Sequence, residues 1–267
     1  MDIPQDIDSF CTWYTKTFDL EIRDQKSKIQ YKTNIKNAYN SVQEHPFFCQ
    51  LPHAIQEWSY EYKDSFKSEL FMDSGDPTLV TKPYESSIDK LFRVNVLWNK
   101  NFPDKPHRNW VNFQNLFVNF NDLIRGTMVC RFIDGPEFVS NKLLELAKEV
   151  GLTGRKYTQE RDDGYYAYHV YIKFPVSLLD EDWNEKGAQI EVEIQITTQL
   201  QEVLRSITHK FYEEKRINPK PEQGNWKWDF KSKKFKVGYL SHTLHLLESI
   251  ILESRDDVLK NEEQNND

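Results

Sequence analysis

Apolar and aromatic residues recur at helical spacing along the N-terminal part of the chain. They lie three or four positions apart in most cases, with polar residues between them: Phe10, Trp13, Tyr14, Phe18, Ile22 and Ile29. This period places them on one face of an amphipathic helix, so the pattern predicts a helix over residues 6–45. The segment HPFFCQLP, with its two prolines, is expected to break that helix, and a second helix is predicted from Ile55 to Phe66. A third is predicted in SSIDKLFRVNVLWNK, with Ser86 as its N-cap and Asp89 in its first turn.

Beyond residue 126 the period changes to alternation, which is typical of strands. The clearest case is IEVEIQIT, whose aliphatic residues Ile190, Val192, Ile194 and Ile196 face one way. TMVCRFI, RKYTQE and YYAYHVYIKF are the other expected strands, the last two joined by a turn at DDG, while EFVSNKLLELAKEVG and the segment from Leu200 to Phe211 are expected to be helical. The order strand, helix, three strands, helix predicts an α+β fold, with a sheet whose helices pack largely on one face.

The C-terminal region combines a basic segment, an amphipathic helix and a polar tail. NWKWDFKSKKFK interleaves lysines with aromatic residues, YLSHTLHLLESIILESRDDVL is expected to be a helix, and NEEQNND is polar. The apolar residues of this helix, Leu244, Leu247, Ile251 and Leu252, require a covering surface.

Composition narrows the class of protein. The net charge of -7 excludes a uniformly basic nucleic-acid coat, and 14% aromatic residues indicate a folded chain. No run of about 18 apolar residues occurs, and the acidic N-terminus does not resemble a secretory signal, so we expect a cytoplasmic protein that does not enter a membrane. Cys11, Cys49 and Cys130 form no CxxC pair, and each is expected to be a reduced, buried thiol.

Two carboxylates are placed where chemistry is possible. Asp122 lies just before a predicted strand, and Glu193 lies on the polar face of another. Two such groups suit Mg²⁺, which takes oxygen ligands and commonly retains substrate phosphates. A solvated sheet face explains Glu193 equally well.

Cations and aromatic residues supply further candidates. Lys82, Lys90 and Arg125 are near enough in sequence to grip a triphosphate, although ordinary surface cations are the alternative, and neither a GxxxxGK[ST] nor a GxGxxG motif occurs. In DDGYYAYH a tyrosine is placed to stack on a nucleobase or to fill the core. His242 and His245 have near-ligand spacing without an evident third ligand.

Five segments, taken in order, resemble the synthetase domain of the RelA/SpoT family, the small alarmone synthetases and their toxic relatives in particular. The family pattern has a Lys-rich element with an internal Ser, an Asp at a strand start, a GYxxxH tyrosine loop, an EVQIRT strand and a helix with HxxYE. The segments here are KPYESSIDKL, NDLIRGTMVCRF, DGYYAYH, EVEIQITT and HKFYEEKR. The resemblance implies a nucleotidyltransferase-like mixed sheet flanked by helices, with a synthetase domain over 76–216, a helical region over 1–75 and an extension over 217–267.

The reaction implied by the resemblance is transfer of pyrophosphate from ATP to the 3′-hydroxyl of an acceptor, with release of AMP. Asp122 and Glu193 would bind Mg²⁺, and Glu193 would also activate the hydroxyl. The other implied roles are ATP binding by Lys82, Ser86, Lys90 and Arg125, and acceptor binding by Tyr165, His169, Gln195, His209 and Tyr212.

The chain departs from the family pattern at two arginines. Val80 stands where relatives have Arg two residues before the first lysine, and Thr197 replaces the Arg of EVQIRT. Three functions therefore stay open: an enzyme that makes guanosine tetra- or pentaphosphate, a toxin-like enzyme that modifies the 3′ end of tRNA, and a degenerate nucleotide-binding module. Residues 1–75 carry no motif, and packing on the sheet, an oligomer interface and binding of a neutralising antitoxin are equally open roles.

Overall fold

The computed structural model describes residues 3–160, 164, 166–217 and 226–266, and the side chains of all of these except 160, 209–217 and 262–266. Two compact units are formed from interleaved segments. The first comprises Met1–Cys49, Leu79–Arg125 and Tyr171–Glu193, and the second Gln50–Thr78, Gly126–Val170 and Ile194–Asp267.

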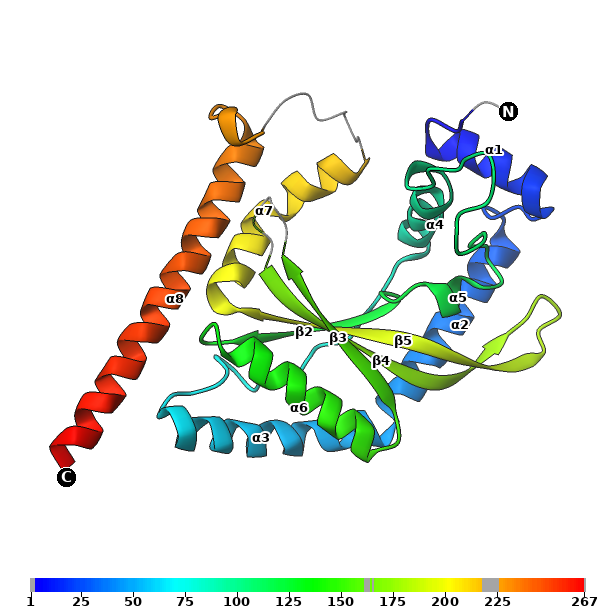
Figure 1. The fold of residues 1–267 in the computed structure, drawn as a ribbon. Helices are drawn as coiled ribbons and strands as arrows, with labels where there is room; N and C mark the ends of the chain where they lie inside the picture. Colours follow the sequence, from blue (N-terminus) through cyan, green and yellow to red (C-terminus); the bar gives the residue numbers. More distant parts are fainter. Residues whose placement is uncertain (1–2, 161–163, 165, 218–225, 267) are drawn as a thin grey trace. The chain divides into compact units, whose positions relative to one another are not determined.

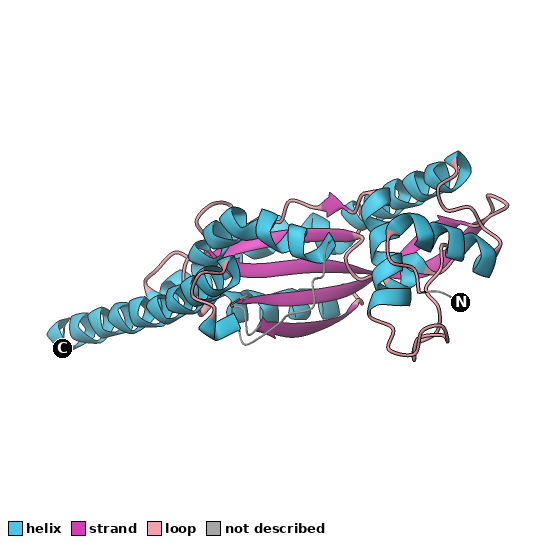
Figure 2. Ribbon diagram, turned by 90° about the horizontal axis from the view of Figure 1, so that it is seen from above, coloured by secondary structure: helices cyan, strands magenta, loops and turns pink. Residues whose placement is uncertain are grey.

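A mixed five-stranded sheet, ordered β1-β2-β5-β4-β3, confirms the predicted α+β class (Figures 1 and 2). Its strands are β1 (Val80–Thr81), β2 (Ile124–Cys130), β3 (Thr153–Glu160), β4 (Tyr166–Leu179) and β5 (Glu185–Thr198). β1 pairs antiparallel with β2, with Val80 opposite Arg125 and Thr81 opposite Ile124. β4 and β5 are joined by a turn in which the Asp180 N–H donates to the Asn184 carbonyl at 2.9 Å.

The alternation of β5 agrees with its burial. The four aliphatic residues predicted to share a face are at most 1% exposed. Ile190 and its three successors at positions 192, 194 and 196 therefore belong to the core, and the odd-numbered residues of β5 lie on the opposite face. This alternation fixes which side of the sheet Glu193 and Gln195 occupy.

The helices of the first unit are α1 (Ile7–Phe18), α2 (Gln25–Gln43), α4 (Tyr84–Phe92) with a π-helical continuation over Arg93–Leu97, and α5 (Leu116–Asn119). The prediction of one helix over 6–45 is wrong, because α1 ends at Asp19 in the left-handed conformation, with φ 52°. Asp24 then begins α2 by accepting a hydrogen bond from the Ser27 N–H at 2.6 Å.

The helices of the second unit, counting α3 with it, are α3 (Pro46–Phe66), α6 (Gly135–Glu149), α7 (Gln199–Ile217), the short 3₁₀ helix Trp226–Trp228 and α8 (Lys233–Asn266). The expected break at HPFFCQLP is confirmed only at its first residue, because α2 ends at Gln43 and α3 begins at Pro46, after Glu44 and His45. The rest of the segment is helical. Pro46 occupies the first turn of α3, where its missing N–H costs no helical bond, and Pro52 is accommodated inside the helix with its ring exposed. α8 also begins earlier than expected and includes part of the basic segment.

Two smaller expectations are corrected. Cys11 and Cys130 are buried, but Cys49 is exposed, because it lies on the outer side of α3. Pro83, not Ser86, is the N-cap of α4, and Glu85 is the acidic residue of its first turn. Among the described helices, none has the length and apolarity to cross a bilayer.

Candidate functional site

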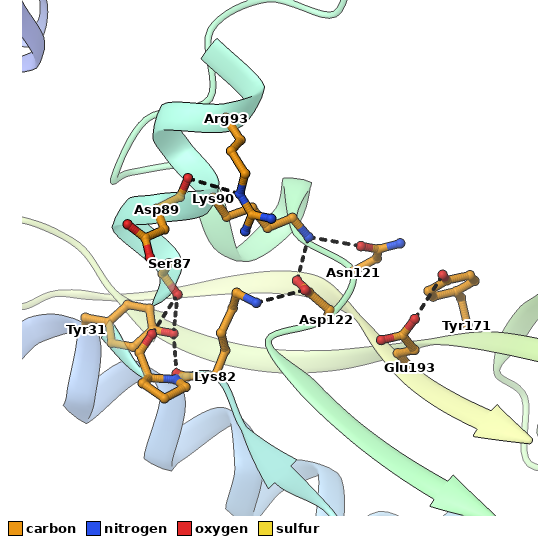
Figure 3. Close-up of polar contacts among 11 residues, drawn as sticks. Tyr31, Lys82, Ser87, Asp89, Lys90, Arg93, Asn121, Asp122, Tyr171 and Glu193 are labelled. Atoms are coloured by element: carbon orange, nitrogen blue, oxygen red, sulfur yellow. Dashed lines mark hydrogen bonds and ion pairs between the residues drawn. The ribbon is translucent and has the colours of Figure 1, made fainter. Parts of the chain in front are cut away.

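Asp122 lies between two lysine side chains in the first unit (Figure 3). Its Oδ2 is 2.9 Å from the Nζ of Lys82, and its Oδ1 is 2.5 Å from the Nζ of Lys90. The lysine side chains are each 14% exposed and that of Asp122 is 21% exposed. The structure therefore brings these three predicted site residues together.

Local backbone structure places the three groups. The Lys82 N–H donates to the Leu123 carbonyl at 2.8 Å, so the residue after β1 is fixed beside the residue after Asp122. The buried Tyr31 hydroxyl donates to the Lys82 carbonyl at 2.8 Å, which ties α2 to the same point. Lys90 comes from the last turn of α4, eight residues after Lys82 along the chain.

Lys90 has a second set of partners. Its Nζ is 3.3 Å from Oδ1 of Asn121 and 4.6 Å from the centroid of the Phe120 ring. Burial lowers the pKa of Lys90 below its ordinary value, against the opposing effect of Asp122. For Asp122, burial acts to raise the pKa, but the ammonium groups of Lys90 and Lys82 outweigh it and hold the pKa below its ordinary value. Asp122 is thus a carboxylate at neutral pH.

Glu193 lies on β5 and is only 5% exposed, so its interpretation as part of a solvated face is wrong. The Tyr171 hydroxyl donates to its Oε1 at 3.1 Å, from the neighbouring strand β4 (Figure 3). Glu193 also acts electrostatically on Lys90, raising the pKa of the lysine against the effect of burial. A buried carboxylate whose charge acts on a largely buried lysine is an unusual polar group for the covered face of a strand.

Arg125 lies on β2, opposite the position on β1 where the family pattern has an arginine and this chain has Val80. It stands opposite Val80 in the antiparallel β1–β2 pair, and both residues are exposed. Directly opposed residues carry their Cβ atoms about 5 Å apart on one face of a sheet. A cation is therefore available beside position 80, although it comes from the other strand.

The neighbouring serines Ser86 and Ser87 of α4 differ in burial and in their contacts. Ser86 is half-buried in the first turn of α4 and is not the cap that the sequence indicated. Ser87 is 1% exposed and lies 2.8 Å from the Tyr31 hydroxyl, so the structural serine is Ser87. The ATP-binding role of Ser86 stays a prediction.

A second polar group lies in the second unit, around a small pocket. It is lined by Thr127, Tyr166, Ala167, Gln195, Thr197, Gln201 and Arg205. Arg205, from α7, donates to Gln195 Oε1 at 3.2 Å and pairs with Glu202 at 2.7 Å. Thr197, which replaces the second family arginine, lines the same pocket and is 7% exposed.

The structure describes the side chains of two of the five residues predicted to bind the acceptor. His169 is buried on β4, and Gln195 is half-buried on β5. Tyr165 and the side chains of His209 and Tyr212 lie outside the described residues. Next to Tyr165, the ring of Tyr166 stacks on His245 of α8, with centroids 3.8 Å apart, and its hydroxyl is 2.6 Å from His242 Nδ1.

Solved structures resemble this chain in fold. Small alarmone synthetase 1 from Bacillus subtilis, in a structure bound to its product pppGpp, matches with a TM-score of 0.57 and 19% identity over 86% of this chain and 98% of its own. Small alarmone synthetase 2 from the same organism gives 0.53 and 17% over 85% and 98%, and a GTP pyrophosphokinase family protein from Streptococcus pneumoniae gives 0.54 and 18% over 87% and 96%.

The chain has the small alarmone synthetase fold. The mixed sheet flanked by helices that the RelA/SpoT resemblance implies is thereby confirmed. No protein-family model matches the sequence, and no curated protein matches it.

Within this small alarmone synthetase fold, the sequence analysis did not identify two polar residues of the candidate site, Tyr171 and Arg205. Tyr171 lies nine residues before Asp180, and Glu193 lies nine residues after Asn184, so counting outward from the β4–β5 turn would have paired them. Arg205 had no such signal, because its contact with Gln195 depends on how α7 packs against β5.

The candidate site contains oxygen donors that suit a divalent cation. Asp122 and Glu193 offer hard oxygen donors, and the described residues contain no group of three or more carboxylate, His or Cys ligands. Two carboxylates with substrate phosphates and water match the way Mg²⁺ is usually held, so the donor set fits. His242 and His245 belong to no such group.

Proposed function

We propose that the protein is a pyrophosphotransferase that moves the β,γ-pyrophosphate of ATP to the 3′-hydroxyl of GDP or GTP. The products are AMP and guanosine tetra- or pentaphosphate. The observation that carries this proposal is the group of Lys82, Lys90 and Asp122. The charge of the buried Glu193 also acts on Lys90 and raises its pKa. Its charges suit a polyphosphate, and the fold resembles alarmone synthetases.

The lysines would exchange Asp122 for phosphate oxygens when ATP binds. Ammonium groups already desolvated and fixed in place lose little freedom on gripping a phosphate. In the reaction a bond forms between the acceptor 3′-oxygen and the β-phosphorus, and the bond from that phosphorus to the α,β-bridging oxygen breaks. The bridging oxygen leaves on AMP, and the hydroxyl proton passes to Glu193 as general base.

Mg²⁺ belongs to the proposal through Asp122 and Glu193. When bound, it would neutralise the charge of the transferring phosphates. Asp122, once released from one or both lysines, would present its carboxylate to the ion, and Tyr171 would hold Glu193 in place through the hydrogen bond at 3.1 Å.

Two relocated arginines favour an active enzyme over a degenerate binding module. Arg125 stands across the strand pair from Val80, and Arg205 reaches Gln195, which is two residues before Thr197 on β5. In each case the family arginine is missing but a guanidinium comes from a neighbouring element. Arg125 would supply positive charge beside position 80, and Arg205 would do so near Thr197 once released from its pair with Glu202.

The test is AMP release by the purified protein with ATP, Mg²⁺ and GDP or GTP. Glu193→Gln keeps the shape of the buried side chain and removes its charge, so we expect a loss of at least about 100-fold in the AMP release that depends on guanine nucleotide. Glu191→Gln, a half-buried neighbour, is the matched control and should keep near wild-type turnover. Equal turnover in wild type and Glu193→Gln would contradict the proposal.

A tRNA acceptor is the second candidate, favoured by the segment before α8. Trp228 is 82% exposed and Phe230 is 65% exposed, and Lys231 lies over the Phe230 ring at 5.8 Å. Exposed rings beside lysines suit stacking on bases and contact with phosphates. Trp228→Ala with Lys231→Glu should abolish labelling of tRNA and spare guanine nucleotides, if tRNA is the acceptor.

A further inference from the structure

A tyrosine of the N-terminal helical region contacts the main chain of a lysine of the candidate site. Tyr31 lies on α2 and is 1% exposed, and its hydroxyl donates to the Lys82 carbonyl at 2.8 Å (Figure 3). The same hydroxyl is 2.8 Å from Oγ of the buried Ser87 on α4. Tyr31 therefore joins α2, the end of β1 and α4 at one point.

The direction of these two hydrogen bonds follows from the groups that make them. A carbonyl only accepts, so the Tyr31 proton is donated to Lys82. Ser87 then donates to the Tyr31 oxygen, because its other acceptor, the Pro83 carbonyl, lies at the longer distance of 3.3 Å. Burial raises the pKa of Tyr31 to about 12, so its hydroxyl stays protonated and remains a donor near neutral pH.

The main chain at Lys82 follows a very short strand. β1 has two residues and lies at the edge of the sheet. The Lys82 N–H donates to the Leu123 carbonyl at 2.8 Å, and the next residue, Pro83, has no N–H to donate. A two-residue edge strand gives little support to the residue after it, so the bond from Tyr31 to the Lys82 carbonyl helps to set the direction in which Lys82 leaves the strand.

α2 is itself fixed on both sides of Tyr31. The buried Gln30 and Asn34 donate to the Leu179 carbonyl, at 3.1 Å and 2.9 Å, and the Leu179 N–H donates to Asn34 Oδ1 at 2.7 Å. The Tyr31 ring also packs against the ring of Tyr84, with centroids 5.0 Å apart. A side chain enclosed in this way keeps a single orientation, which a residue that positions another one requires.

We propose that Tyr31 is a positioning residue for ATP binding, and that α2 thereby supports the site. Through the Lys82 carbonyl, Tyr31 fixes the main chain from which the Lys82 ammonium reaches Asp122 at 2.9 Å and would reach a phosphate of ATP. A displacement of about 1 Å at such a group is enough to weaken its contact strongly. This inference rests on the proposed function, and it gives residues 1–75 a role that the sequence left open.

The test is the affinity for ATP, measured by isothermal titration calorimetry of the full-length protein with Mg²⁺ and without an acceptor. Tyr31→Phe removes one oxygen, and we expect ATP to bind about tenfold more weakly, which is the effect of one lost buried hydrogen bond. Tyr84→Phe is the matched control, because its buried hydroxyl donates to the Ile22 carbonyl and not to Lys82. It should leave ATP affinity unchanged, and circular dichroism confirms that each variant is folded.

A double-mutant cycle with Lys82→Ala separates positioning from a general loss of stability. If Tyr31 acts through the Lys82 ammonium, Tyr31→Phe should weaken ATP binding by less than about twofold once that ammonium is absent. An undiminished effect of Tyr31→Phe in the Lys82→Ala background would overturn the proposal. Equal ATP affinity of Tyr31→Phe and wild type, or a wild-type protein that does not bind ATP, would also overturn it.

Failure of the proposed function gives a different result. It would appear as a wild-type protein that binds ATP but releases no AMP when GDP or GTP is added. The difference in ATP affinity between Tyr31→Phe and Tyr84→Phe would then still support Tyr31 as a positioning residue.

Discussion

Asp122 illustrates how one carboxylate can organise two cations. Held at 2.9 Å and 2.5 Å from Lys82 and Lys90, it compensates charges that are largely removed from water. Without it, two ammonium groups would repel one another in a partly buried place. A residue with a proposed part in binding therefore also stabilises the fold when no nucleotide is bound.

We predict that Asp122→Asn lowers the free energy of unfolding at pH 7 by about 3 kcal/mol, the cost typical of removing one partner of a buried pair. Urea denaturation measures this value. Asp64→Asn, whose carboxylate is 91% exposed and 3.5 Å from Lys67, is the control and should stay within about 0.5 kcal/mol of wild type.

The pH dependence of this difference has a definite sign. The pKa of Asp122 is lower in the folded chain than its ordinary value of 3.8, so its contribution is fully present above about pH 4 to 5. It is lost as the pH falls through the folded pKa. The stability gap between wild type and Asp122→Asn should narrow from pH 6 to pH 3, and a constant or widening gap would argue against an ionised, paired Asp122.

The sequence predicted some individual residues of the candidate site and missed others, in each case for a physical reason. Asp122, Lys82 and Lys90 belong to short motifs, and the structure brings them together. Burial of Glu193 was not predictable from alternation, because alternation gives the face of a strand and not what covers that face. Arg205 reaches its partner through tertiary packing, which no local pattern encodes.

Among the elements, the short β1–β2 pair determines where a cation lies. Because Val80 and Arg125 are directly opposed, an arginine at either position would project from the same place on the sheet. Under the proposed function, Arg125 would supply the positive charge that Val80 lacks.

We predict that Arg125→Ala raises the KM for ATP about tenfold, as expected for one lost charged contact to phosphate. Steady-state AMP release measures it. The combined variant Val80→Arg, Arg125→Ala should recover most of the loss, whereas Arg131→Ala, an exposed arginine just beyond β2, should have no effect. Failure of Val80→Arg to recover activity would refute the compensation.

A second element-scale prediction concerns how α8 is anchored. The Arg255 side chain is 9% exposed, pairs with Asp134 and lies about 5.0 Å from the rings of Phe66 and Phe132. Arg255→Ala removes the guanidinium that pairs with Asp134, and we expect a loss of about 3 kcal/mol together with faster amide exchange in the C-terminal half of α8. Unchanged exchange there would show that other contacts hold the helix.

The helices show what local patterns can and cannot establish. Their existence and most of their apolar faces followed from the 3.6-residue period. Their boundaries did not, since α1 ends at a left-handed Asp19 and α3 begins at a proline that the sequence analysis placed in a break. Both cases depend on single backbone conformations, which a periodic pattern averages out.

For the whole molecule, the fold is retained although identity to the solved synthetases is 17–19%. The order of the predicted strands and helices was enough to predict the α+β class, and five short motifs in order carried the family resemblance. The acceptor was not predictable in the same way. Similarity of fold does not determine which acceptor a site binds.

The most direct measurement is to incubate the full-length protein with Mg²⁺ and ATP labelled at the γ-phosphate, offering GDP, GTP, deacylated tRNA or no acceptor in parallel. We expect label in GDP or GTP, with equimolar AMP, and none in Glu193→Gln. Label in tRNA alone would support pyrophosphate transfer as the reaction but would show that tRNA, and not GDP or GTP, is the acceptor. Absence of label from every acceptor, with no release of AMP, would contradict a pyrophosphotransferase.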